Sequence, residues 1–126
     1  MVTWILWALI LAMLAWMGFN YLRIRRAAKI VDNEEFEALI RTGQLIDLRD
    51  PAEFHRKHIL GARNIPSSQL KSSLAALRKD KPVLLYENQR GQRVTNVALY
   101  LKKQGFSEIY ILSYGLDSWN GKVKTS

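Results

Sequence analysis

Hydrophobic residues are concentrated at the start of the chain and then recur in short runs. The first stretch, from Val2 to Leu22, has no charged side chain over 21 residues. As an α-helix with a rise of about 1.5 Å per residue it would be about 31 Å long, which matches the hydrocarbon core of a bilayer. The pattern therefore predicts a transmembrane helix at residues 1–22.

The alternative for this stretch is a cleaved signal peptide, which needs a basic start, a shorter apolar region and a small-residue cleavage site. None of these is clear, and aromatic residues lie toward the two ends of the stretch, as they do at membrane interfaces. These are Trp4, Trp7, Trp16 and Tyr21. The uncleaved anchor is therefore the favoured interpretation.

Beyond residue 28, strand-like and helix-like runs alternate. Strands are expected in AKIVD, QLIDLR, GARNIP, KPVLLY and EIYIL, and helices in NEEFEALIRTG, DPAEFHRKH, SQLKSSLAALRKD, the run from Val94 to Gly105, and GLDSWNG. Asp32 with Glu35 predicts a capped start for the first of these helices, and Ser67 or Ser68 a cap for the third. Alternation of this kind predicts a three-layer α/β domain with a central parallel sheet.

Composition and charge narrow the function. The chain has 126 residues, 48% of them hydrophobic, and a formal net charge of +8. The charge is densest at Arg23, Arg25, Arg26 and Lys29. Basic residues beside a span remain on the cytoplasmic side, so we expect a single-pass protein of the cell membrane with its folded part in the cytoplasm. The other basic residues are scattered without stacking aromatics, which argues against nucleic-acid binding.

These patterns divide the chain into three parts: a span at 1–22, a basic juxtamembrane linker at 23–28 and one folded domain at 29–126. The chain has no cysteine. This excludes disulfides, thiolate metal sites and thiol catalysis by its own residues. We expect no cofactor, and no metal site, since His55 and His58 lack an apparent third ligand.

A polar loop follows the most strand-like run, where sites gather in parallel sheets. It comprises Glu87, Asn88, Gln89, Arg90, Gly91, Gln92 and Arg93. Its two arginines, Arg90 and Arg93, are candidates for anion binding, although a solvated Arg90 is an open alternative.

Two longer stretches resemble the rhodanese-like family. LIDLRDPAEFHRKHILGARNIP is similar to the family's first signature, and VLLYENQRGQRVTNVALYLKKQGFSEIYILSYGLDSW to its active-site strand, loop and helix with the segment that follows. The matching positions of the first signature are Asp47, Arg49, Glu53, Phe54, His58, Ile59, Gly61, Ala62, Asn64, Ile65 and Pro66. The resemblance covers about residues 29–121 and implies the rhodanese fold, with Asp47, Arg49, Glu53 and His58 in structural roles.

The family's usual chemistry is sulfur transfer through a cysteine persulfide. The position of that cysteine holds Glu87, or Asn88 in the other possible alignment, and a carboxylate cannot carry sulfane sulfur as a thiolate does. Glu87 and Arg93 are also six residues apart, against five in the common sulfurtransferase loop. The resemblance therefore implies an inactive module that binds a cytoplasmic protein or a small anion. The alternative is a sulfurtransferase-related component that relies on a partner's thiol.

Glu87 itself is expected to be the anion of this loop. Hydrogen bonds from the loop and a nearby guanidinium would favour the ionised carboxylate and lower its pKa. The competing interpretation is a Glu87 side chain that points into solvent.

Overall fold

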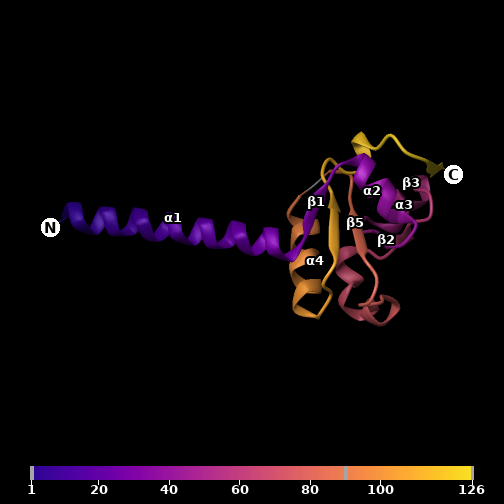
Figure 1. Ribbon diagram of the computed structural model, residues 1–126. Helices are drawn as coiled ribbons and strands as arrows, with labels where there is room; N and C mark the ends of the chain where they lie inside the picture. Colours follow the sequence, from indigo (N-terminus) through magenta and orange to yellow (C-terminus); the bar gives the residue numbers. More distant parts are fainter. Residues whose placement is uncertain (1, 90, 126) are drawn as a thin grey trace.

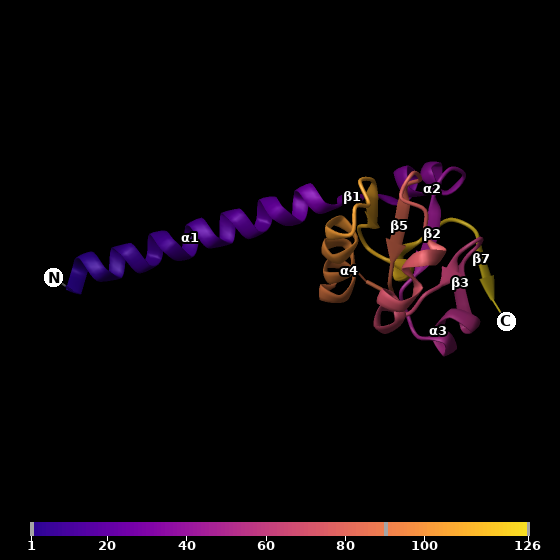
Figure 2. The same cartoon turned by 90° about the horizontal axis from the view of Figure 1, so that it is seen from below.

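The computed structural model describes residues 2–89 and 91–125. One long helix, α1 (Val2–Ala27), extends away from a folded α/β part that contains all the other elements (Figures 1 and 2). The N-terminus lies at the far end of α1, and the C-terminal strand lies on the opposite side of the folded part. Among the described residues, α1 is thus the one element that stands outside the fold.

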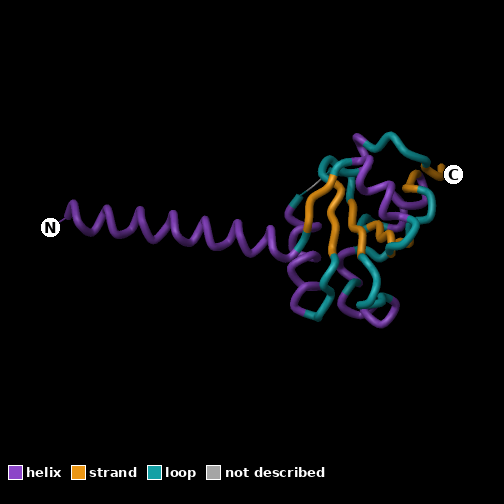
Figure 3. Tube along the Cα trace, viewed as in Figure 1, coloured by secondary structure: helices purple, strands orange, loops and turns teal. Residues whose placement is uncertain are grey.

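The central sheet has five strands in the order β1-β6-β5-β2-β4, and every pairing in it is parallel. Strands lie in the middle of the folded part with helices beside them (Figure 3). The strands of the central sheet are β1 (Lys29–Val31), β2 (Gln44–Asp47), β4 (Arg63–Asn64), β5 (Val83–Tyr86) and β6 (Ile109–Leu112). The predicted parallel sheet is therefore confirmed. A second, antiparallel pair was not predicted: β3 (Lys57–Ile59) pairs with β7 (Val123–Thr125).

Helices cover both faces of the sheet. Side chains of β5 alternate, so that Val83 and Leu85 pack on one side and Leu84 and Tyr86 on the other. The first side is covered by α4 (Gln92–Lys103) and by the 3-10 helices η1 (Ser67–Gln69) and η2 (Lys71–Ala76). The second is covered by α2 (Asn33–Ile40) and η3 (Leu116–Ser118). This is the three-layer arrangement that the strand and helix pattern predicted.

Local signals explain where several elements begin and end. The Asp32 carboxylate accepts the backbone N–H of Glu35 at 2.9 Å, which is the predicted cap of α2. Pro51 opens the short helix α3 (Pro51–Arg56), where a missing N–H is harmless. Gly105 has a φ of +100°, and it ends α4 in a backbone conformation that favours glycine.

Two expected α-helices are 3-10 helices instead. The run SQLKSSLAALRKD forms η1 and η2, with Pro66 rather than a serine at the start of η1 and no side-chain cap. The Ser72 hydroxyl donates to the Gln69 carbonyl at 2.9 Å, and such local serine bonds compete with regular helix formation. GLDSWNG likewise contains only the three-residue helix η3.

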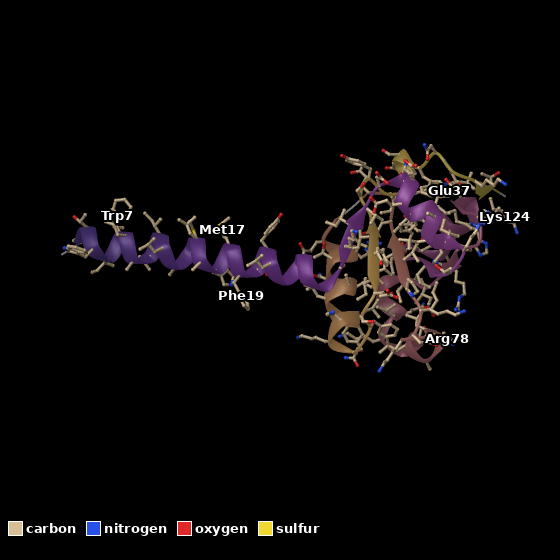
Figure 4. The ribbon with its side chains drawn as sticks, viewed as in Figure 1. Trp7, Met17, Phe19, Glu37, Arg78 and Lys124 are labelled. Atoms are coloured by element: carbon tan, nitrogen blue, oxygen red, sulfur yellow. The ribbon has the colours of Figure 1, made fainter. Side chains whose placement is uncertain are left out.

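Helix α1 has the length and composition of a membrane span. The candidate segment, Val2–Leu22, has a mean hydropathy of 2.0 and none of it is buried against the protein. Trp7, Met17 and Phe19 project from the helix far from the folded part (Figure 4). A signal sequence shares these properties, so the segment is a candidate span by length and composition.

The segment expected as a linker, 23–28, continues the backbone of α1. Helix α1 continues through these basic positions to Ala27, and β1 begins at Lys29. Ala28, the one residue between them, is buried in the core that α4 covers. The backbone N–H and C=O groups within these turns are therefore bonded inside the helix.

Candidate functional site

The candidate site lies where β2 and β5 end. These strands are neighbours, and Asp47 is paired in register with Tyr86. The polar loop therefore leaves β5 beside the Asp47–Arg49 segment, as expected for the carboxyl edge of a parallel sheet. Leu48 donates its N–H to the Tyr86 carbonyl at 3.2 Å, which extends this pairing beyond the strand ends.

Asp47 and Arg49 form a buried ion pair. The Asp47 carboxylate lies 2.8 Å from one terminal nitrogen of Arg49 and also accepts the Arg49 backbone N–H at 2.9 Å. The Arg49 side chain also donates to the Lys57 carbonyl. Burial works to lower the pKa of Arg49, but hydrogen bonding and the charge of Asp47 raise the pKa overall. This geometry agrees with the structural roles that the resemblance implies for Asp47 and Arg49.

Asn88 connects this pair to helix α3. Its side-chain oxygen accepts from Arg49 at 3.0 Å, and its side-chain nitrogen donates to the Glu53 carboxylate at 2.9 Å. Glu53 also lies 3.9 Å from Arg49. Sequence reasoning treated Asn88 only as an alternative position for the missing cysteine, and it missed this bridging role. The available signal was an amide, able to donate and accept at once, two residues after the end of a strand.

Glu87 turns toward the helix start rather than into solvent. One carboxylate oxygen accepts the Val94 backbone N–H at 3.0 Å, and the other lies 3.7 Å from Nε of Arg93. The side chain is 13% exposed. The expectation of an inward-facing anion at the start of α4 therefore agrees with the geometry.

The expected direction of the Glu87 pKa is wrong. Burial raises this pKa above its ordinary value, more than the Val94 hydrogen bond and the Arg93 charge lower it. The charges of Asp47 and Glu53 raise it further. One backbone hydrogen bond and one long contact to a guanidinium are too few to offset the removal of a carboxylate from water.

The loop backbone is held by the segment after β6. The Leu116 N–H donates to the Glu87 carbonyl at 2.8 Å, and the Asp117 N–H donates to the Asn88 carbonyl at 3.0 Å. Gly115 permits this approach, because a Cβ added there would lie 2.4 Å from the Asn88 carbonyl oxygen. Its φ of +70° also favours glycine. The conformation after Tyr86 is thus fixed by residues almost thirty positions away.

The remaining loop residues lie at the rim. Gln89 donates to the Asp117 carboxylate at 3.3 Å, and Gln92 donates to Asn96 on its own helix at 2.9 Å. Gly91 is the N-cap residue of α4. Arg90, the second candidate for anion binding, lies outside the described residues.

Two further polar residues have structural roles near the site. Tyr86 accepts the Ile59 N–H at its phenol oxygen at 3.0 Å, and burial, with the nearby Asp47 charge, raises its pKa far above the ordinary value. His58 contacts the Phe54 carbonyl through Nδ1 at 2.7 Å and stacks on the Phe54 ring. The described residues contain no group of three or more acidic or histidine side chains placed to hold a metal ion.

The side chains gathered at this edge of the sheet are carboxylates, guanidinium groups and an amide, and the chain has no thiol. At the end of β5 the family's persulfide chemistry needs a thiolate, and the side chain there is a carboxylate bonded to a backbone N–H. Asp47 and Arg49 already satisfy each other, so neither is available as a base or an anion clamp. Arg93 remains: its side chain is 50% exposed and its contact with Glu87 is loose.

Comparisons with known proteins agree with this geometry. The family model described as "Rhodanese-like domain" matches residues 32–122. An uncharacterized Bacillus subtilis protein, YqhL, is 47% identical over 113 residues, which cover 90% of this chain and 89% of that protein. The thiosulfate sulfurtransferase GlpE of Stutzerimonas stutzeri is 36% identical over 92 residues, covering 72% of this chain and 84% of that enzyme.

Solved structures share the fold at lower identity. A rhodanese-related protein from Thermoplasma volcanium has a TM-score of 0.70 at 23% identity and covers 78% of this chain and 99% of that one. A full-length protein from Lactobacillus plantarum has a TM-score of 0.68 at 20% identity and covers 91% and 98%. At these identities the likeness concerns the fold alone. Together with the family match, it shows that the chain belongs to the rhodanese-like domain family.

Proposed function

We propose that this chain is a membrane-anchored rhodanese-like module that binds a protein or a small anion and does not itself transfer sulfur. The observation that carries the proposal is the placement of Glu87. Its carboxylate accepts the N–H of Val94 at the start of α4, where the resemblance places the family's cysteine. A chain without cysteine has no side chain that can hold a persulfide there.

The binding part of the proposal rests on Arg93. It is half exposed at the helix start beside the loop, and its guanidinium is a good partner for carboxylates and phosphates. Arg90 is proposed as a second contact from its place in the sequence. Asp47, Arg49, Glu53 and Asn88 hold the loop in place and are proposed as structural residues.

The membrane part of the proposal rests on α1. None of its apolar segment, Val2–Leu22, is buried against the protein, and burial of so much apolar surface in a bilayer is strongly favourable. The basic residues at 23–29 favour the cytoplasm for the folded part. We propose that residues 2–22 span the membrane, that 23–28 extend the helix through the headgroup layer and that 29–126 form the domain.

Sulfur transfer is tested on the purified full chain in detergent with thiosulfate and cyanide. We expect no turnover above buffer. The variant Glu87→Cys should remain far below an active sulfurtransferase assayed alongside, because the six-residue loop misplaces the N–H groups for the transferred sulfur. Gln89→Cys, at an exposed position of the same loop, is the matched control for a newly introduced thiol. Clear turnover by the unmodified chain would refute the proposal.

Topology is tested by adding protease to intact cells and to inverted membrane vesicles. The domain should survive in intact cells and be digested in the vesicles, while the chain resists extraction by alkaline carbonate. Digestion in intact cells would contradict the orientation. A mature chain that lacks residues 1–22 would show that the apolar stretch is a signal sequence.

A second candidate is a sulfurtransferase component whose partner supplies the thiol. It is favoured by the 36% identity to the thiosulfate sulfurtransferase GlpE. Membranes that contain the chain would then accelerate sulfur transfer from thiosulfate to a protein thiol, compared with membranes that lack it. Equal rates in the two preparations would exclude this role under the assay conditions.

A further inference from the structure

A cleft lies beside the candidate site, between α4 and the 3-10 helices η1 and η2. Its volume is about 260 Å³. Leu70 and Val97 contribute apolar surface, and the Ser67 hydroxyl, Lys71, Arg93 and Tyr100 contribute polar groups. Drug-sized ligands occupy pockets of roughly 300–1,000 Å³, so this cleft suits a smaller molecule or one side chain.

The residues that line the cleft have a net positive charge. Two of its lining residues, Lys71 and Arg93, are cationic, and none is acidic. The segments that form its walls, 67–79 and 92–104, contain no aspartate or glutamate. They also carry Lys102 and Lys103, whereas Arg78 is paired with Asp80. By contrast, helix α2 on the other face of the sheet carries three glutamates and no lysine or arginine.

The two cations of the cleft are available to a ligand. Nζ of Lys71 lies 5.3 Å from the centre of the Tyr100 ring, which keeps the ammonium group close to the cleft wall. The Arg93 side chain is 50% exposed, and its 3.7 Å contact with Glu87 is too long for a strong hydrogen bond. An anion in the cleft would therefore compete with a weak contact for Arg93 and would meet no acidic side chain on the walls.

We propose that this cleft is the binding site for an anion that carries an apolar group, held between Lys71 and Arg93 with its apolar part on Leu70, Val97 and Tyr100. The proposal deepens the binding function proposed above and rests on it. Glu87 fills the cradle at the start of α4, so an external anion is bound beside the loop instead of within it. The same anionic group can come as a free small molecule or as a side chain of a partner protein.

The test uses the isotopically labelled full chain in micelles of a zwitterionic detergent, with phenyl phosphate as the probe. In NMR spectra, the backbone amide signals of residues 67–71 and 93–100 should shift as phenyl phosphate is added, and the shifts should saturate at high phenyl phosphate concentration. Inorganic phosphate lacks the ring and should bind at least tenfold more weakly. A short phosphotyrosine peptide carries the same group on a side chain. Tighter binding of the peptide identifies a protein ligand, and tighter binding of phenyl phosphate identifies a small molecule.

Matched variants separate the cleft from general charge attraction. Lys71→Gln should weaken phenyl phosphate binding roughly tenfold, the scale for losing a charge-assisted hydrogen bond. Lys102→Gln removes the same charge from an exposed position on α4 outside the cleft and should leave binding unchanged. Equal losses in the two variants would overturn the proposal.

Two other results would overturn it. One is the absence of saturable shifts, and the other is equal affinity for inorganic phosphate and phenyl phosphate. The thiosulfate assay on the same sample reports separately on the proposed function. If the chain turns over thiosulfate and binds no probe, both the proposed function and the proposed cleft are wrong. If the chain is inactive toward thiosulfate and binds no probe, only the proposal for the cleft is wrong.

Discussion

The ends of β2 and β5 lie next to each other in the sheet, yet they hold their carboxylates in opposite ways. Asp47 is fully buried and is bonded to the guanidinium and the backbone N–H of Arg49. Glu87 is only partly buried, and its carboxylate has fewer partners: one backbone hydrogen bond and a 3.7 Å contact with Arg93. The more buried carboxylate is thus the better compensated one.

This comparison shows that an anion site depends on the number of partners rather than on the position alone. Both carboxylates lie at strand ends, and Glu87 also lies at the start of a helix, where an anion is favoured. Burial nevertheless raises the pKa of Glu87. A helix start with one bonded N–H therefore does not replace the several donors that Arg49 brings to Asp47.

The largest expected effect comes from breaking the Asp47–Arg49 pair. Arg49→Met should lower the free energy of unfolding by about 3–5 kcal/mol, because it leaves a buried carboxylate without its cation. Denaturant titration of the full chain in detergent, followed by the fluorescence of Trp119, measures the loss once the helix tryptophans are replaced.

Arg78→Met is the control for this prediction. Arg78 pairs with Asp80 at 2.6 Å, but both side chains are more than half exposed. An exposed pair of this kind contributes little to stability because water screens it, so we expect a much smaller loss than for Arg49→Met. Similar losses in the two variants would mean that burial does not distinguish the two ion pairs.

The next effect concerns the contact that holds the Glu87 loop. Gly115→Ala should cost about 2–4 kcal/mol, because the residue has a φ of +70° and its Cβ would meet the Asn88 carbonyl. Gly61→Ala is the matched control, since Gly61 has a φ of +91° and nothing within 4 Å of an added Cβ. Thermal unfolding should show a clearly smaller loss for Gly61→Ala. Equal losses would mean that the close approach to Asn88 is relaxed at no cost.

The fold could largely be predicted from the sequence, because its strands are short apolar runs and its site follows one of them. The Asp32 cap, the stop at Gly105 and the parallel order all follow from local patterns. The β3–β7 pair could not be predicted, since it joins two short segments about 65 residues apart that have no alternation of their own. The serine-rich run before Leu77 was predicted as an α-helix because its leucines fall on one face, while the serines favour tighter turns.

The residues of the candidate site could be predicted from the sequence, but the protonation energetics of Glu87 could not. The resemblance indicated Asp47, Arg49 and the loop after Tyr86, and the structure brings them together. The pKa direction of Glu87 depends on how many donors reach it and how much water remains. Neither quantity is encoded in residue spacing. The bridge through Asn88 likewise depends on the distance between α3 and the loop, which only the fold sets.

Asn88→Ala tests whether the loop after β5 stabilises the Asp47–Arg49 pair at the end of β2. It removes an acceptor from Arg49 and a donor to Glu53, and we expect a loss of about 1–3 kcal/mol. Gln89→Ala removes one exposed 3.3 Å hydrogen bond from the next position and should change the stability by less than about 0.5 kcal/mol. Chemical denaturation of both variants gives the comparison. An Asn88→Ala variant as stable as the unmodified chain would show that the Asp47–Arg49 pair needs no support from the loop.

The smallest expected effect, and the sharpest test of the comparison, is Glu87→Gln. The glutamine oxygen can still accept the Val94 N–H, so the change in stability at neutral pH should be less than about 1 kcal/mol. The way in which the stability changes with pH follows from the pKa of Glu87. Because burial raises the pKa of Glu87 in the folded state, the protonated form contributes stability that is fully present below the ordinary value of 4.5 and is lost as the pH rises through the folded value.

Glutamine does not titrate, so the stability of Glu87→Gln relative to the unmodified chain should improve between pH 4 and pH 7. Asp80→Asn is the opposite control. A hydrogen bond from Arg78 lowers the pKa of Asp80, so the contribution of Asp80 is present at neutral pH and is lost as the pH falls. Unfolding measured at several pH values should therefore give slopes of opposite sign for the two variants. If the Glu87→Gln variant instead becomes relatively less stable toward pH 7, the loop stabilises the Glu87 anion after all. In that case the Val94 hydrogen bond and Arg93 would outweigh burial, and the two strand ends would hold their carboxylates in the same way.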